Sequence, residues 1–285
     1  MSDDLVVALG ARPDKFQSDM NQAGDIADGA VSRMRGERPE WFPCWRGETA
    51  VIVAGGPSAA GVPLEVARGQ AKFIVINDSW RLAPWADALY ASDFAWWGVN
   101  HGAPAFRGLK ISQDDHERRF IELMTKLRDI GLLVEGDPPH LTAPSLQPEF
   151  EEILNWRREK HKWGLRQVRG NQYCDRIIMT PGEIGHNATG GGFEALNLAI
   201  QFGSRQIVLV GYDMRIDRGI CWHGKYGQGL SNKTETDVIR WRKKLDAQAP
   251  WLKTLGVEVL NASSVSALTA YPKVDFAEAV DSLAR

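Results

Sequence analysis

The sequence predicts an α/β fold, with a Rossmann-like, mainly parallel sheet, helices on both faces and an irregular helical insertion. From residue 49 onwards, short apolar runs alternate with segments of helical periodicity. Strands that alternate with helices typically form a parallel sheet that is covered on both faces. Several of the apolar runs end in glycine or in small polar residues. Ligands of such sheets bind beyond the carboxyl ends of the strands, so these strand ends form the candidate site.

The composition is that of an ordinary globular protein. The 285 residues suffice for one large α/β domain or two small ones, and the net charge of −2 gives no general field for nucleic acid or an acidic membrane. No apolar run approaches the roughly 18 residues that a membrane span needs. The start is acidic, unlike a secretory signal, and the three cysteines fit neither a disulfide framework nor a zinc site. We expect a cytoplasmic protein, in the host cytoplasm if it is phage-encoded.

The pattern along the chain predicts three regions. Residues 1–38 are expected to form an N-terminal helical extension, and residues 39–48, which include two prolines, a linker. Residues 49–285 are expected to form a Rossmann-like nucleotide-binding domain with an insertion at about 98–172. Strands are expected at 51–53, 73–77, 88–93, 177–179, 206–211 and 257–260, and helices at 115–130, 191–202 and from 235 with a break at Pro250.

The turn after the first strand is the most informative segment. Gly55 and Gly56 allow the backbone to approach a ligand closely, and Pro57 and Ser58 suit the first turn of a helix. The free N–H groups and the positive dipole end of a helix attract phosphate. The turn lacks both the Gly-Lys-Ser/Thr ending of a Walker A loop and the full dinucleotide fingerprint, which disfavours ATPase and NAD dehydrogenase functions.

Polar residues end the next two predicted strands. Asn77 can donate and accept hydrogen bonds and so suits the edge of a base or a ribose, but it equally fits a turn. Asp93 precedes an aromatic run and could bind ribose or a metal, or simply cap a helix.

A second glycine-rich turn precedes the helix expected at 191–202. Thr189 and the amides that follow it could hold a second phosphate group, although a structural N-cap explains Thr189 equally well. The three successive glycines that begin with Gly190 and Gly191 exceed what capping requires, so we favour a phosphate or nucleotide contact.

The candidates for chemistry lie after the last strong strand. Asp213 ends that strand, and the glycine-rich segment 219–229 is flexible enough to act as a lid. Within it, His223 is the best candidate for proton transfer because histidine titrates near neutral pH; the alternative is an ordinary surface histidine. The basic stretch 156–169 fits a solvated helix face better than nucleic-acid binding.

The strand-end motifs resemble those of two related families. A strand ending in Gly-Pro-Ser, a strand ending in Asn, a small-residue helix start and a later strand ending in Gly-x-Asp are similar to motifs of the bacterial sialyltransferases of glycosyltransferase family 42. They are also similar to motifs of the 6-hydroxymethylpterin diphosphokinase, MptE-like, family. Dispersed runs over roughly residues 45–275 resemble phage proteins labelled "norphogenetic", and residues 1–34 resemble the N-terminus of phage tail tape-measure proteins.

The sialyltransferase resemblance implies roles for particular residues. It implies that a cytidine nucleotide is held by Gly55, Gly56, Ser58 and Asn77, that the donor phosphate is touched by Thr189, Gly190 and Gly191, and that His223 is the general base. Two departures leave the donor open. The two glycines before Pro57 are adjacent, where that family usually has Asn between them, and Ala-Thr-Gly replaces its Ser-Ser-Gly helix start.

Three functions follow as hypotheses. The first is a transferase that uses a nucleotide or nucleotide sugar as donor to an acceptor hydroxyl, with His223 and Asp213 as catalytic residues. The second is an ATP-dependent pyrophosphokinase, which requires Mg²⁺ and would use Asp93 or Asp213 as ligands. The third is a non-catalytic morphogenesis or host-interaction protein with phage structural proteins as partners.

Overall fold

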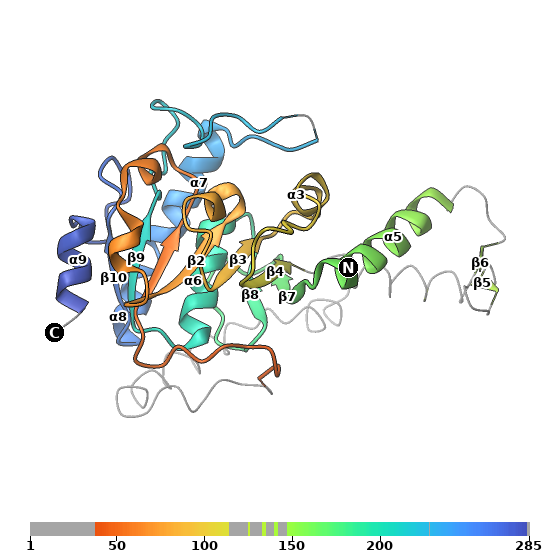
Figure 1. Ribbon diagram of the computed structural model, residues 1–285, viewed down its shortest axis with the longest axis horizontal. Coiled ribbons are helices and arrows are strands. Elements are labelled where there is room, and N and C mark those ends of the chain that lie inside the picture. The colour runs from red at the N-terminus through yellow and green to blue at the C-terminus, as the bar shows by residue number, and fades with distance from the viewer. Residues whose placement is uncertain are drawn as a thin grey trace, which may run out of the picture.

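The computed structural model describes residues 38–113, 125, 133–134, 140–141, 147–227 and 229–283. Its centre is an eight-stranded sheet in the order β10-β9-β1-β2-β3-β4-β7-β8 (Figure 1). Every pair of neighbouring strands in this sheet is parallel. The strands of the sheet are β1 (Ala50–Val53), β2 (Lys72–Ile76), β3 (Ala88–Ala91), β4 (Leu109–Gln113), β7 (Arg166–Asn171), β8 (Glu183–Gly185), β9 (Gln206–Val210) and β10 (Glu258–Asn261). The predicted Rossmann-like α/β fold is confirmed.

Helices connect these strands. They are α3 (Phe94–Val99), α5 (Gln147–Trp163), α6 (Gly191–Phe202), α7 (Glu235–Asp246), α8 (Ala249–Thr254) and α9 (Phe276–Leu283). Short 3-10 helices follow β1 at Pro57–Gly61 and β2 at Asn77–Arg81, and a third spans Leu64–Ala67. A separate antiparallel pair joins β5 (Leu133–Val134) and β6 (His140–Leu141). Figure 1 shows α5 projecting away from the sheet.

The strand order reverses between β1 and β9. From β1 the sheet grows in one direction through β2, β3, β4, β7 and β8, and the chain then returns to the other side of β1 to add β9 and β10. In open parallel sheets the loops at such a reversal diverge to opposite faces and leave a crevice at the carboxyl ends of the strands. The turns after β1 and β9 therefore flank the expected ligand position.

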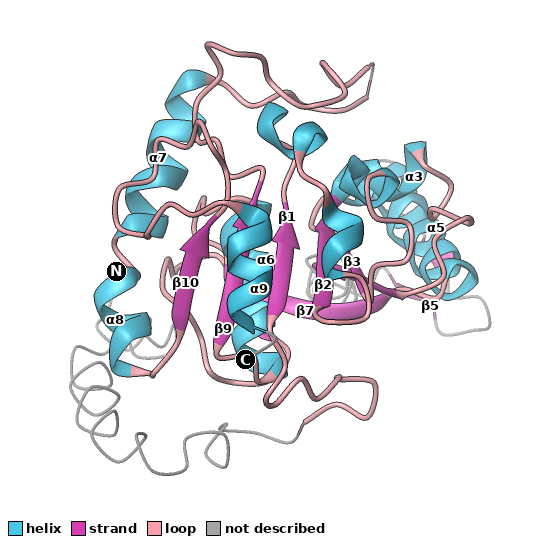
Figure 2. Cartoon of the chain, turned by 60° about the vertical axis from the view of Figure 1, so that its left-hand side comes forward, coloured by secondary structure: helices cyan, strands magenta, loops and turns pink. Residues whose placement is uncertain are grey.

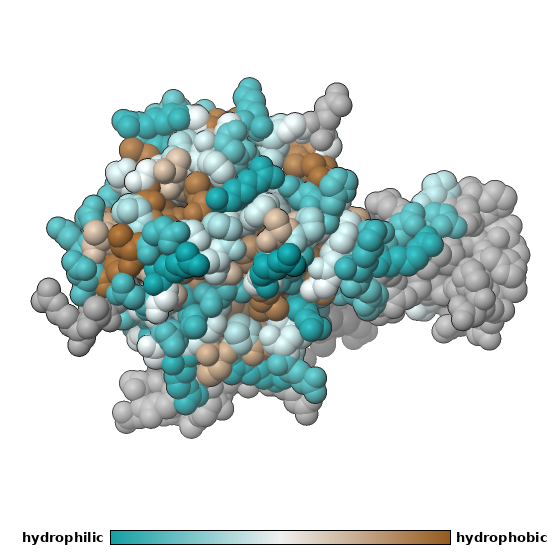
Figure 3. Space-filling model, in the orientation of Figure 1, coloured by the Kyte–Doolittle hydropathy of each residue, from teal (hydrophilic) through white to brown (hydrophobic). Residues whose placement is uncertain are grey.

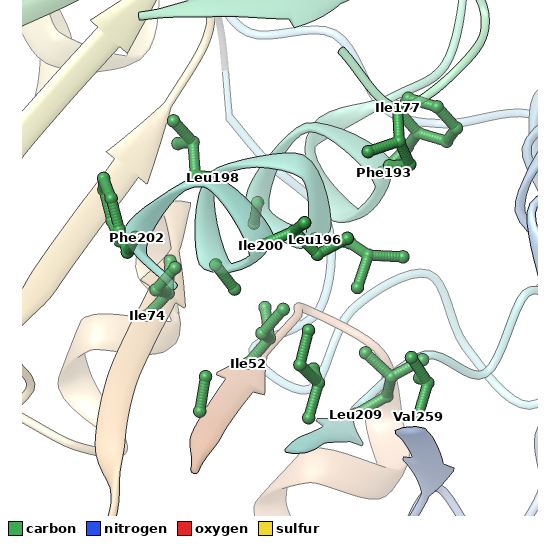
Figure 4. Packing of buried hydrophobic residues seen from close by; sticks show 14 of the residues in the cluster. Ile52, Ile74, Ile177, Phe193, Leu196, Leu198, Ile200, Phe202, Leu209 and Val259 are labelled. Carbon is green, nitrogen blue, oxygen red and sulfur yellow. The ribbon is translucent and has the colours of Figure 1, made fainter. Parts of the chain in front are cut away.

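The core lies on both faces of the sheet. On one face, Ile52 and Ile74 of the strands pack with Leu196 and Ile200 of α6 (Figure 4). On the other, the alternate strand residues, such as Val51, pack with α9 and α3. Figure 2 shows the sheet between its covering helices. Burial of both faces explains why these strands read as continuous apolar runs.

Residues 39–48, which were predicted to be a linker, pack against the core. Phe42 and Trp45 are buried and pack edge-to-face on Phe202 of α6, with ring centroids 4.8 and 4.7 Å apart. The backbone N–H of Trp45 donates to the carbonyl of Phe202 at 2.7 Å. The predicted linker thus contributes to the core, while the extension predicted over residues 1–38 lies outside the described residues, apart from residue 38.

The region predicted as an insertion at 98–172 contains two strands of the main sheet. β4 and β7 both lie in it, and each pairs with its neighbour in parallel. The helix predicted over 115–130 lies outside the described residues, apart from residue 125.

The strand predicted at 177–179 is wrong. The backbone there pairs with helix side chains rather than with another strand: Ile178 donates to Asn197 Oδ1 at 3.0 Å and accepts from the side-chain amides of Asn197 and Gln201. Gln248 Oε1 accepts from the N–H of Ile177. Buried backbone groups need partners, and here amide side chains supply them.

Within the described ranges, no helix combines the length and apolar character that crossing a membrane requires. On the face shown in Figure 3, apolar residues occur in small patches between hydrophilic ones.

Candidate functional site

The turns after β1 and β9 are in direct backbone contact. The N–H of Gly56 donates to the carbonyl of Gly211 at 2.9 Å. A Cβ on Gly56 would lie 2.3 Å from that carbonyl oxygen, and a Cβ on Gly211 would lie 2.3 Å from the carbonyl of Ala54. Gly211 also has a φ of +71°. Glycine is therefore required on both sides, because any side chain would separate the two strand ends.

Asp213 joins these turns from its buried position after β9. Its Oδ2 accepts from the backbone N–H of Ser58 at 3.0 Å, and its Oδ1 accepts from the Ser58 hydroxyl. Asp213 is only 2% exposed. The two donors of Ser58, which the sequence offered for a phosphate at this turn, are thus used by an internal carboxylate. This geometry makes Asp213 and Ser58 a link between the two turns.

The start of α6 lies at the same edge of the sheet. A Cβ on Gly190 would meet the ring of Trp241 at 2.8 Å, one on Gly191 would meet Ile76 at 3.2 Å, and one on Gly192 would meet the ring of Tyr212 at 2.9 Å. Ile76 ends β2 and Tyr212 follows β9, so the first turn of α6 is seated on two strand ends.

This seating leaves backbone donors at the helix start. Within the described part of the chain, no backbone carbonyl outside α6 accepts from the N–H groups of Gly191 and Gly192. Thr189, in contrast, is 1% exposed, and its hydroxyl donates to the carbonyl of Gly185 at 3.2 Å. The amides, rather than the Thr189 side chain, are the groups that an anion could reach.

The segment predicted as a lid lies over the ends of β1 and β2. The N–H of Trp222 donates to the carbonyl of Gly55 at 3.0 Å. The next residue, His223, has a side chain that is 17% exposed, and its Nε2 lies 4.0 Å from Oδ2 of Asp78. That Nε2 atom is buried and has no hydrogen-bond partner in the described structure. The lid histidine is therefore directed at the strand end of β2.

The environment of His223 favours its neutral form. Burial lowers its pKa below the ordinary 6.5, and the positive charges of Arg81 and Lys233 act in the same direction. The carboxylate of Asp78 opposes them. A neutral imidazole with a free nitrogen is the form that accepts a proton.

Asn77 faces the lid from the end of β2. It has a φ of +50°, a left-handed conformation that asparagine tolerates better than most residues. Burial raises the pKa of the Tyr226 hydroxyl, while hydrogen bonding to the side chain of Asn77 and to the backbone of Asp78 acts in the opposite direction. Asn77 thus contacts a lid tyrosine at the position where the sequence predicts contact with a nucleotide.

Asp93 caps a helix. Its Oδ1 accepts from the N–H of Ala95 at 2.9 Å at the start of α3, which is the capping alternative considered from the sequence. Its role toward ribose or Mg²⁺ stays a prediction. In the ranges that the structure describes, no three His, Cys, Asp or Glu side chains are grouped in a way that could hold a metal ion.

Two further features were not singled out from the sequence. Asp78, next to the predicted Asn77, is buried beside His223. His186 follows β8, and its Nδ1 lies 2.5 Å from Oε1 of Glu194, which is fully buried and whose Oε2 accepts from the Tyr90 hydroxyl at 2.7 Å. The sequence does contain one sign of this network, which is that Glu194 lies within a helix segment whose pattern is otherwise mainly apolar.

Comparisons with known proteins give a distant likeness only. No protein-family model matches the sequence, and no curated protein matches it. Among solved structures, the chain is similar to the sialyltransferase CstII from Campylobacter jejuni in complex with cytidine-5'-monophosphate, with a TM-score of 0.42 and 12% identity over 80% of this chain and 85% of that one.

Two more CstII complexes are similar. The complex with CMP-3FNeuAc has a TM-score of 0.36 and 12% identity, and the complex with a trisaccharide acceptor and CMP has a TM-score of 0.37 and 10% identity. Each covers 80% of this chain and 86% of that chain. At these scores the function has to be derived from the residues of this chain.

Proposed function

We propose that the protein is a transferase that binds a nucleotide or nucleotide sugar at the carboxyl edge of the sheet and transfers a group to an acceptor hydroxyl. The observation that carries this proposal is the pair of groups around the end of β2. On one face of the sheet the glycine amides of α6 are seated against Ile76, and on the other His223 directs an unpartnered nitrogen toward Asp78. Asn77 lies between Ile76 and Asp78 in the chain.

The donor is held in this proposal by backbone and amide groups. The N–H groups of Gly191 and Gly192, at the positive end of a 12-residue helix, contact its phosphate. The side chain of Asn77 binds the base or ribose when Tyr226 moves away with the lid. The turn at Gly55 and Gly56 forms one wall of the site, because the Ser58 donors are already used by Asp213.

His223 acts as the general base. Its lowered pKa keeps the imidazole neutral at pH 7, so it can take the proton of the acceptor hydroxyl. The acceptor oxygen then forms a bond to the donor carbon, and the bond from that carbon to the phosphate oxygen breaks with its electrons on the departing nucleotide. Asp213 serves as a positioning residue for the turn after β1, in place of the catalytic role predicted from the sequence.

A ligand screen tests the binding step. We expect one of CMP, CDP, UDP, GDP, ADP or ATP to raise the melting temperature of the purified protein, since a ligand at about 100 times its Kd adds ~2.7 kcal/mol of stability. His223→Asn should keep this shift and lose transfer of the donor group. His161→Asn, the same change at an exposed position of α5, is the matched control. No shift with any of the six nucleotides would refute the proposal.

The same screen distinguishes the proposed transferase from the second hypothesis, an ATP-dependent pyrophosphokinase. A pyrophosphokinase should respond to ATP only when Mg²⁺ is present. The residues named for Mg²⁺ are partly engaged, Asp93 as a helix cap and Asp213 by Ser58. Binding and turnover without added metal would support the nucleotide-sugar transferase over this alternative.

A further inference from the structure

Asp78 is held rigidly beside His223. It lies in the 3-10 helix that follows β2 and is 6% exposed. Its Oδ2 accepts from the indole N–H of Trp96 at 3.0 Å, and its Oδ1 lies 3.1 Å from the guanidinium of Arg81. Both oxygens are thus fixed by neighbours that do not belong to the lid.

The spacing between Asp78 and His223 suits an electrostatic role. The 4.0 Å between Oδ2 and Nε2 exceeds hydrogen-bond distance, so in this arrangement the carboxylate acts on the imidazole through its charge rather than by accepting a hydrogen bond from it. An opposite charge at this distance still favours the charged imidazolium. Of the described charged groups that act on His223, Arg81 and Lys233 disfavour its protonation and Asp78 alone favours it. The lid residues Cys221 and Tyr226 border the same site.

We propose that Asp78 is the positioning residue of His223, which it orients toward the end of β2 and whose positive charge it compensates during transfer. This inference rests on the proposed function, in which Nε2 of His223 takes the acceptor proton while the acceptor oxygen displaces the nucleotide phosphate from the donor carbon. The charge that forms on His223 is balanced by a buried carboxylate, and the charge that forms on the phosphate leaves with the nucleotide.

Two variants with opposite expected signs test this assignment. Asp78→Asn keeps the shape and an acceptor for Trp96 but removes the charge, so the pKa of His223 should fall, by roughly 0.5 to 1. Arg81→Gln removes an opposing positive charge and leaves Asp78 less neutralised, so the pKa of His223 should rise. Titration of the imidazole resonances by NMR, assigned with His223→Asn, measures both changes on the full chain without any substrate.

A matched control removes a carboxylate elsewhere. Asp87→Asn takes away a partly buried carboxylate that lies near Lys72 and accepts from the N–H of Phe73, at the opposite end of β2. The pKa of His223 should not change in this variant. A change as large as that in Asp78→Asn would mean that the effect is a general loss of structure, and it would overturn the assignment.

Turnover then separates the two proposals. With the nucleotide sugar that corresponds to the nucleotide found in the screen as donor, Asp78→Asn should lower kcat by roughly 10-fold or more and leave KM for the donor unchanged, while the acid limb of the pH profile moves with the pKa of His223. Unchanged titration in both Asp78→Asn and Arg81→Gln would overturn the role of Asp78. Opposite shifts without turnover of any donor would instead refute the proposed transferase and leave the Asp78–His223 pairing established.

Discussion

At the scale of single residues, the contact between Gly56 and Gly211 decides how closely the two central turns can approach. The sequence shows Gly55 and Gly56 next to each other and predicts a tight turn. The partner of Gly56, however, lies more than 150 residues away along the chain. At Gly56 and at Gly211, the atom nearest to an added Cβ would be a backbone carbonyl oxygen rather than the end of a flexible side chain. Backbone atoms cannot rotate out of the way, so the strain of a substitution must be absorbed by moving a strand end.

Gly56→Ala should therefore destabilise the protein. We expect a loss of about 1–3 kcal/mol in the free energy of unfolding, because the new Cβ would meet both the Gly211 carbonyl and the Asp213 carboxylate. Urea denaturation measures this change. Gly61→Ala is the matched control, since a Cβ there has nothing within 4 Å, and it should be neutral or slightly stabilising. Equal effects of the two variants would contradict the close approach described above.

Elements were predicted well where burial alone decides their pattern. The runs at β1, β2 and β9 are apolar apart from the first residue of β2 and of β9, because both of their faces are covered, and they were located from the sequence. β4 and β7 were missed because their sequences, Leu-Lys-Ile-Ser-Gln and Arg-Gln-Val-Arg-Gly-Asn, are largely polar. Val168 is the one residue of β7 that is buried in the way that residues of a central strand are.

The candidate site could be predicted only in part. The rule that ligands bind beyond parallel strand ends placed Asn77, Asp213 and His223 at one edge, since the carboxyl ends of parallel strands meet at the same edge of a sheet. The partners of these residues could not be predicted. The link from Asp213 to Ser58 spans 155 residues, and no local spacing records which donors an aspartate will meet. The three glycines at α6 are likewise explained by the rings and side chain packed against them.

The link between the turns after β1 and β9 gives a prediction at the scale of elements. Asp213→Ala should remove an acceptor from both the N–H and the hydroxyl of Ser58 and cost about 1–3 kcal/mol in the free energy of unfolding. Ser58→Ala should cost less, because the backbone donor keeps its acceptor. Chemical denaturation of both variants checks the order. Asp217→Asn, at an exposed loop position, serves as the control and should leave the denaturation midpoint unchanged.

At the scale of the whole molecule, the candidate site at the carboxyl edge is distinct from a cavity elsewhere on the fold. The carboxyl edge carries the α6 amides, Asn77 and the lid histidine. A separate cavity of about 450 Å³ lies beside β10 and α8, with Lys253, Glu258 and Tyr271 among its lining residues. Its walls include the start of β10, so it lies away from the strand ends where the candidate residues meet. Our account places the nucleotide at the first of these positions.

Hydrogen–deuterium exchange with the nucleotide found in the screen tests that placement most directly. At saturating nucleotide, we predict slower exchange of backbone amides at the start of α6, at residues 190–194, and in the lid, at residues 219–227. The segment around the cavity, at residues 249–258, should exchange at the same rate with and without nucleotide. Protection confined to residues 249–258, or the absence of protection at both the α6 start and the lid, would contradict the account.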